Sequence, residues 1–149
     1  MRVMSMCVKG RERFFNPNTD VTRRIHKRPF VKGEHFRAIE KGQGIPKGGH
    51  QVIYAECKII SAEWEPLGDI IKRPYRSITW EGAVPPNRSE VAREGFPDLT
   101  PEQFCAMVIK AHSGKHLALE SPVLRYEYVH VREEDLQSDA FHLTQNKLE

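Results

Sequence analysis

The sequence predicts an α+β fold, in which strands and helices occupy separate parts of the chain. Residues 51–64 carry β-branched and aromatic residues without an interrupting Gly or Pro, which favours a long strand. Residues 123–131 alternate in a way that predicts a strand packed on both faces. Between these strands, Thr100 is followed by Pro101 and, at capping-box spacing, by Gln103, so we expect an α-helix to begin there.

The remaining predicted elements are shorter. We expect one strand over residues 2–8 and another over residues 36–39, the second after a turn at residues 31–34. Short helices are expected near residues 67–71 and 89–94, because each precedes a segment rich in Pro or Gly.

Length and composition fit one folded domain. The 149 residues are enough to bury a core without disulfides or a structural metal. With 39% hydrophobic and 29% charged residues, the chain resembles neither a membrane protein nor a disordered one. Its three widely spaced cysteines fit no disulfide framework or CxxC metal site. Without a signal peptide or an apolar run of roughly 18 residues, we expect a cytoplasmic protein with no membrane partner.

Basic residues are concentrated in the first third of the chain. The net charge is only +3, but residues 9–47 contain eleven Lys and Arg residues against four Asp and Glu residues. A basic surface of this kind can hold a phosphate chain by releasing counterions. A solvated surface without a ligand is the alternative interpretation.

Residues 19–24, 31–44 and 94–104 form three segments whose sequences and order resemble the signatures of the ASCH domain family, which belongs to the PUA-like superfamily. TDVTRR at residues 19–24 resembles the family's K-T-x-T-x-R segment. VKGEHFRAIEKGQG at residues 31–44 resembles the G-D-x-h-x-A-v-E-K-G-x-G variant of phage-type members. EGFPDLTPEQF at residues 94–104 is similar to the E-G-F-x-x-h-T-x-x-x-F stretch before the family's last helix, and it is the most specific of the three.

This resemblance implies a single domain built on a PUA-like small mixed β-barrel flanked by helices. The similar part covers about residues 18–131. Residues 72–88 look like an insertion, and residues 132–149 form a charged tail.

The resemblance also implies candidate catalytic residues. In hydrolytic members a threonine is the nucleophile, a lysine activates it and a glutamate transfers the proton. Thr22 and Glu94 match two of these positions, and Lys41 can approach from the next loop. The family's lysine position is occupied by Thr19, which cannot act as an amine base. We therefore expect a binding protein rather than an efficient hydrolase.

The expected ligand is single-stranded RNA or a nucleoside or nucleotide, including a modified one. Glu94 would accept from an exocyclic amine of the base. An unpaired base stacks on aromatic side chains, and of Trp64, Trp80, Tyr75 and Phe96 we expect Trp80 or Tyr75 to be exposed for this purpose. The residues expected to hold the phosphates are Arg23, Arg24, Lys41 and Lys47.

Several alternatives remain open. The chain can be a metal-dependent ribonuclease on single-stranded RNA, an amidohydrolase on N-acylated cytidine, or a phage-type protein that binds a host protein through residues 72–88. Thr22 can instead cap a turn or helix, and Glu94 can order its loop through backbone N–H groups. No cofactor is expected apart from Mg²⁺ or Mn²⁺ in the ribonuclease case, because among the histidines only His112 and His116 have i,i+4 spacing.

Overall fold

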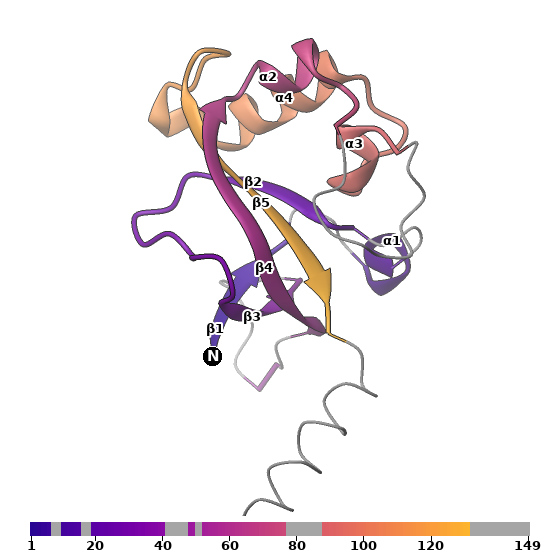
Figure 1. Ribbon diagram of the computed structural model, residues 1–149. Coiled ribbons are helices and arrows are strands. Elements are labelled where there is room, and N and C mark those ends of the chain that lie inside the picture. The colour runs from indigo at the N-terminus through magenta and orange to yellow at the C-terminus, as the bar shows by residue number, and fades with distance from the viewer. Residues whose placement is uncertain (7–9, 16–18, 41–47, 50–51, 77–87, 132–149) are drawn as a thin grey trace, which may run out of the picture.

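The protein folds into a curled β-sheet with helices outside it. The computed structural model describes residues 1–6, 10–15, 19–40, 48–49, 52–76 and 88–131 (Figure 1). In this described part of the chain, five strands form one mixed sheet that curls into a half-barrel (Figure 1). The predicted α+β class is therefore confirmed, with a barrel-like sheet.

The strand order places the first two strands of the chain at opposite edges of the sheet. Across the sheet the order is β1, β3, β4, β5, β2. β1 pairs with β3 in parallel, and all other neighbours are antiparallel. The strands are β1 (Arg2–Ser5), β2 (Val21–Arg24), β3 (His35–Ile39), β4 (Ile53–Pro66) and β5 (Pro122–His130).

Strand β4 changes its neighbour along its length, and among the described residues only Cys57 and Lys58 have register partners on both sides. It pairs with β3 as far as Lys58, and with β5 from Cys57 to Pro66. A bulge between Ile59 and Ser61 shifts the register on the β5 side, and a bulge bends the strand that carries it. Within the described residues, the second half of β4 therefore has a strand on one side only.

Of the four α-helices in the described residues, three gather at one end of the sheet, at the top of Figure 1. The helices predicted near residues 67–71, 89–94 and 100 are confirmed, and the strands predicted within residues 2–8 and 51–64 are also present. The first helix was not predicted. The helices are α1 (Arg11–Phe15), α2 (Asp69–Lys72), α3 (Glu90–Arg93) and α4 (Pro101–Ala111).

Strand β5 packs on both faces, as its alternating sequence predicts. Leu124, Tyr126 and Tyr128 are buried in the larger core inside the curl of the sheet. Val123 points the other way, into a second core that contains residues of α2, α3 and α4. The sheet thus separates two apolar clusters, and the next charged residues on the Val123 face take part in the ion pairs described below.

Helix α4 begins with the predicted capping box. The backbone N–H of Gln103 donates to Oγ1 of Thr100 at 3.1 Å, and the N–H of Thr100 donates to Oε1 of Gln103 at 2.9 Å.

We expect Thr100→Ala to lower the free energy of unfolding by about 1 kcal/mol, because an N–H of the first turn loses its acceptor. Thr100→Ser keeps the hydroxyl and is expected to retain most of that stability. Urea denaturation of the two variants tests this prediction, and equal losses would contradict it.

Candidate functional site

Thr22 and Arg24 lie together at an edge of the sheet. Their side chains share one face of β2, because side chains alternate along a strand. Nε of Arg24 donates to Oγ1 of Thr22 at 3.0 Å, and Nη2 lies 3.6 Å from Sδ of Met6. Met6 directly follows β1, so this contact joins the two edges of the curled sheet. We call the place defined by Met6, Thr22 and Arg24 the seam.

The guanidinium of Arg24 has no carboxylate within ion-pair distance in the described part of the chain, although it is half-buried. Its charge acts on its surroundings. Burial, followed by the charges of Arg24 and Arg2, lowers the pKa of His26 to about 4. Because a partly dehydrated cation is stabilised by an opposite charge, the seam suits an anionic group.

Arg23 points to the opposite face of β2 and is buried there. Its guanidinium lies 2.9 Å from Glu94, 2.9 Å from Glu90 and 3.4 Å from Glu65. Burial alone lowers the pKa of Arg23, but these carboxylates outweigh it and raise that pKa. The charge of Arg23 is thus balanced within the protein, where it fastens β2 to α3 and β4.

Two further arginines extend these ion pairs on the same face of the sheet as Arg23. Arg93 lies 2.9 Å from Asp20 and 2.6 Å from Glu127, and Arg125 lies 2.8 Å from Glu90. All of these side chains are buried. We call the connected set the buried ion network, with members Asp20, Arg23, Glu65, Glu90, Arg93, Glu94, Arg125 and Glu127.

Glu90 lies at the centre of the buried ion network and accepts hydrogen bonds from Arg23, Arg93 and Arg125. Burial alone raises the pKa of Glu90, but the hydrogen bond from Arg125 and the charges of Arg23 and Arg125 outweigh it and lower the pKa to about 2. Burial raises the pKa of Glu94 above its ordinary value, although Arg23 opposes this.

Thr19, which stands at the lysine position of the resembled signature, is fully buried. Its Oγ1 accepts a hydrogen bond from the hydroxyl of Tyr128 at 2.8 Å, and its backbone oxygen lies 2.6 Å from Nε2 of His130. Burial holds the pKa of Tyr128 well above its ordinary value, so the phenol keeps its proton. Thr19 thus fixes the chain just before β2 against β5.

The structure brings the predicted site residues together in two pairs. Arg23 contacts Glu94 on one face of β2, and Arg24 contacts Thr22 on the other. Within the described contacts, no hydrogen bond joins Thr22 to Glu94. The other predicted site residues lie outside the described residues, and their roles stay predictions: Lys41, Lys47 and Trp80. Most of the predicted insertion at residues 72–88 also lies outside them.

Sequence reasoning missed most of the buried ion network, although two signals pointed to it. The alternation in residues 123–131 places Arg125 and Glu127 on a face that was expected to be packed, and buried charges are normally paired. Glu90 and Arg93 have the i,i+3 spacing of a helical ion pair, which the structure contains.

The exposed aromatic residues differ from the prediction. Tyr75 is 67% exposed, as expected, but Trp64 is 57% exposed and was expected to be buried. Phe96 is half-buried and packs against both apolar clusters. Trp64 therefore presents an aromatic surface that is open to a ligand.

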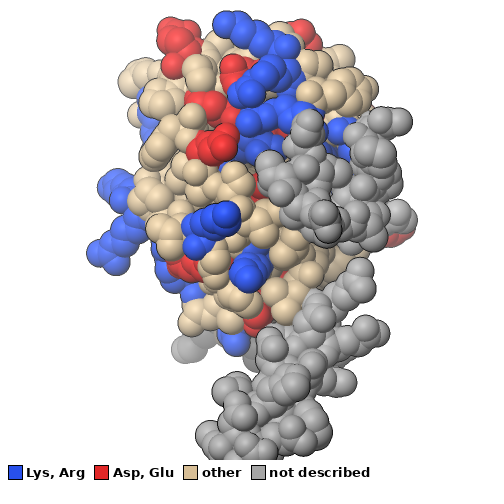
Figure 2. Space-filling view, viewed as in Figure 1, with Lys and Arg blue, Asp and Glu red and all other residues tan. Residues whose placement is uncertain are grey.

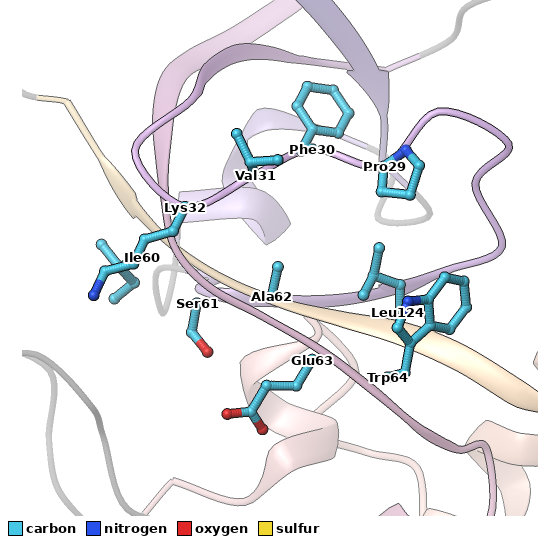
Figure 3. A pocket seen from close by; sticks show the side chains of 10 residues that line it. All are labelled: Pro29, Phe30, Val31, Lys32, Ile60, Ser61, Ala62, Glu63, Trp64 and Leu124. Carbon is cyan, nitrogen blue, oxygen red and sulfur yellow. The ribbon is translucent and has the colours of Figure 1, made fainter.

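A pocket of about 570 Å³ lies beside Trp64, between residues 29–32 and the second half of β4 (Figure 3). Pro29 and Phe30 are on one side of the hollow, and Leu124 and Trp64 are on the other (Figure 3). This pocket does not include the residues predicted for the site from the sequence.

Basic and acidic side chains alternate on the face shown in Figure 2. At the end that carries α2, α3 and α4, blue and red side chains lie next to one another, while isolated basic side chains lie lower on the face (Figure 2). Not all basic residues of the segment at residues 9–47 are on the surface. Arg23 is buried, whereas Arg37 is exposed.

Within the described residues, no three His, Cys, Asp or Glu side chains are placed to hold a metal ion. No described helix has both the length and the apolar character needed to cross a bilayer. Nδ1 of His112 lies 3.0 Å from the backbone oxygen of Val108, so this histidine closes the end of α4.

Comparison of the chain with models of protein families, with curated proteins and with solved structures finds no match.

Proposed function

We propose that this protein is an ASCH-type, PUA-like domain that binds single-stranded RNA or a nucleotide, with a phosphate held at the seam. The observation that carries the proposal is the state of Arg24. This half-buried guanidinium has no described carboxylate partner, whereas Arg23 beside it contacts three.

The geometry of Arg24 fits a phosphate. A guanidinium has five N–H donors, and in the described contacts Nε bonds to Thr22 while Nη2 contacts only the weak acceptor Sδ of Met6. The terminal nitrogens thus retain donors for the oxygens of a phosphate, with which arginine forms paired hydrogen bonds. The hydrogen bond to Thr22 orients the guanidinium before a ligand arrives.

The described contacts favour binding over hydrolysis. A threonine nucleophile needs a base within hydrogen-bond reach, but Oγ1 of Thr22 accepts its hydrogen bond from a cation. Glu94, the expected proton-transfer group, is paired with Arg23. The raised pKa of Glu94 suits a general acid, so the hydrolase alternatives are tested below.

Arg24→Gln is expected to weaken binding to a single-stranded RNA oligonucleotide about 10-fold or more, because a hydrogen bond to a charged group contributes about 1.5–3 kcal/mol. Fluorescence anisotropy of labelled RNA at low salt measures this. Arg37→Gln is the matched control, because Arg37 is an exposed cation on β3. Equal affinities for the wild type and Arg24→Gln, or no binding by the wild type, would refute the proposal.

The same samples separate the alternatives. Shortening of the RNA that stops with EDTA would identify a metal-dependent ribonuclease, and release of acetate from N-acetylcytidine without sensitivity to EDTA would identify an amidohydrolase. Retention of a host protein without RNA binding would favour the protein-partner alternative.

A further inference from the structure

The pocket beside Trp64 has the size and the walls of a ligand site. Its volume of about 570 Å³ falls within the range of about 300–1,000 Å³ that is typical of small-molecule sites. Pro29 and Phe30 form one wall, and Ala62, Leu124 and Trp64 form the other (Figure 3). Trp64 presents its indole at the open side, where β4 lacks a second neighbouring strand among the described residues.

The loop that forms one wall is fixed without a ligand. We call residues 25–33 the pocket loop. The backbone N–H of Phe30 donates to the hydroxyl of Tyr126 at 2.9 Å, and the N–H of Gly33 donates to the backbone oxygen of Ile59 at 2.8 Å. A site that is already ordered loses less entropy when it binds.

The pocket and the seam lie on the same face of the sheet. Arg24 on β2 is the register partner of Leu124 on β5, and Leu124 is the partner of Trp64 on β4. Side chains of register partners emerge on one face. Neighbouring strands are about 4.8 Å apart, which places the backbones of Arg24 and Trp64 roughly 10 Å apart. The cation of Arg24 and the exposed ring of Trp64 therefore lie on the same face of the sheet, two strands apart.

The charged residues around the pocket favour an anionic ligand. The pocket loop contains no acidic residue and carries the exposed cations Lys27 and Arg28, with Lys32 on the pocket wall. Ser61 and Glu63 also line the pocket, but their side chains point away from Pro29 and Phe30 (Figure 3), and Glu63 pairs with Arg76. A proline-rich peptide also binds grooves lined by aromatic residues, but it brings no phosphates for these cations.

We infer that the pocket receives an unpaired base of single-stranded RNA, stacked on Trp64, while a phosphate of the same strand meets Arg24. This inference rests on the proposed function and adds the base contact to it. Further phosphates of the strand lie along Lys27, Arg28 and Lys32, so an RNA strand binds more tightly than a mononucleotide.

The test uses the full chain with Trp80→Phe, which leaves Trp64 as the remaining one of two tryptophans. Titration with a single-stranded RNA of about 8 nucleotides, within the site sizes of comparable barrels, is expected to quench the fluorescence of Trp64 to saturation. A mononucleotide is expected to quench it only at higher concentration.

Trp64→Leu is expected to weaken binding of the same RNA about 5- to 150-fold, in keeping with the contribution of one stacked base. Trp64→Phe keeps a smaller ring and is expected to lie between Trp64→Leu and the wild type. Phe15→Leu is the control, because Phe15 is an exposed aromatic residue of α1 and does not line the pocket. Circular dichroism checks that each variant is folded.

The outcomes separate this inference from the proposed function. If Arg24→Gln weakens RNA binding but Trp64→Leu does not, and Trp64 is not quenched, the base pocket is refuted and the phosphate site stands. If no RNA binds, both are refuted. Quenching by a proline-rich peptide but not by RNA overturns the inference in favour of a peptide groove.

Discussion

Glu90→Gln is expected to lower the free energy of unfolding by about 3–5 kcal/mol, which is the usual cost of removing one partner from a buried ion pair. Glu90 is fully buried and contacts Arg23, Arg93 and Arg125, so its loss leaves three guanidinium groups short of negative charge. Because a domain of this size has a total stability of about 5–15 kcal/mol, the variant is expected to lose about a fifth or more of that stability.

The control for this prediction is Glu63→Gln. Glu63 makes a 3.5 Å ion pair with Arg76, but its side chain is 60% exposed. An exposed ion pair contributes about 0–1 kcal/mol, so this change of the same two residue types is expected to leave stability nearly unchanged. Urea denaturation of both variants gives the comparison, and similar losses would show that the buried ion network is not the main constraint on β2 and α3.

The protein is expected to lose stability in acid below about pH 4.5, through Glu90. The pKa of Glu90 is about 2 in the folded protein, against an ordinary value of 4.5. A lowered pKa in the folded state stabilises the protein above the unfolded value, and this stabilisation is lost as the pH falls from about 4.5 to about 2. The difference corresponds to about 3 kcal/mol.

Asp20 and Glu94 act in the opposite sense. Burial raises the pKa of both carboxyl groups, so they take up protons in the folded protein at a higher pH than in the unfolded chain, which favours folding as the pH falls. The loss due to Glu90 is therefore expected to appear below the pH at which these two groups titrate. Urea midpoints measured between about pH 7 and about pH 2.5 test this, and a midpoint that stays constant below about pH 4.5 would contradict it.

Local sequence patterns predicted the helices and strands that are stabilised by contacts close in sequence. The capping box at Thr100 is formed by residues three apart, and the alternation of residues 123–131 directly reports the two packed faces of β5. The strand over residues 51–64 was predicted because β-branched residues fit a pleated sheet. In each case the decisive contacts are encoded within a few residues of the chain.

Strand β2 was not predicted, because the residues that stabilise it are distant in sequence. Two adjacent arginines, Arg23 and Arg24, do not have the apolar alternation of a strand. Arg23 can be buried only because Glu65, Glu90 and Glu94 converge on it in the folded chain. This convergence cannot be recognised from local sequence. Arg23 was therefore predicted to bind phosphate, whereas in the structure its guanidinium pairs with these carboxylates.

The exposure of Trp64 also depends on long-range pairing. The residue lies in the best predicted strand, where an aromatic side chain is normally core. It is exposed because β3 pairs with β4 only as far as Lys58, which leaves the second half of β4 with β5 alone among the described strands. Local patterns in the sequence predict the extent of β3, but they do not predict which part of β4 it pairs with.

The salt dependence of RNA binding tests the central claim most directly, namely that Arg24 holds a phosphate of single-stranded RNA. Each phosphate neutralised on a single strand contributes about 0.7 to the slope of log K against log salt concentration. The account predicts that Arg24→Gln binds more weakly than the wild type and lowers this slope by about 0.7. An unchanged slope, or wild-type protein that binds no single-stranded RNA at the lowest salt concentration, would contradict it.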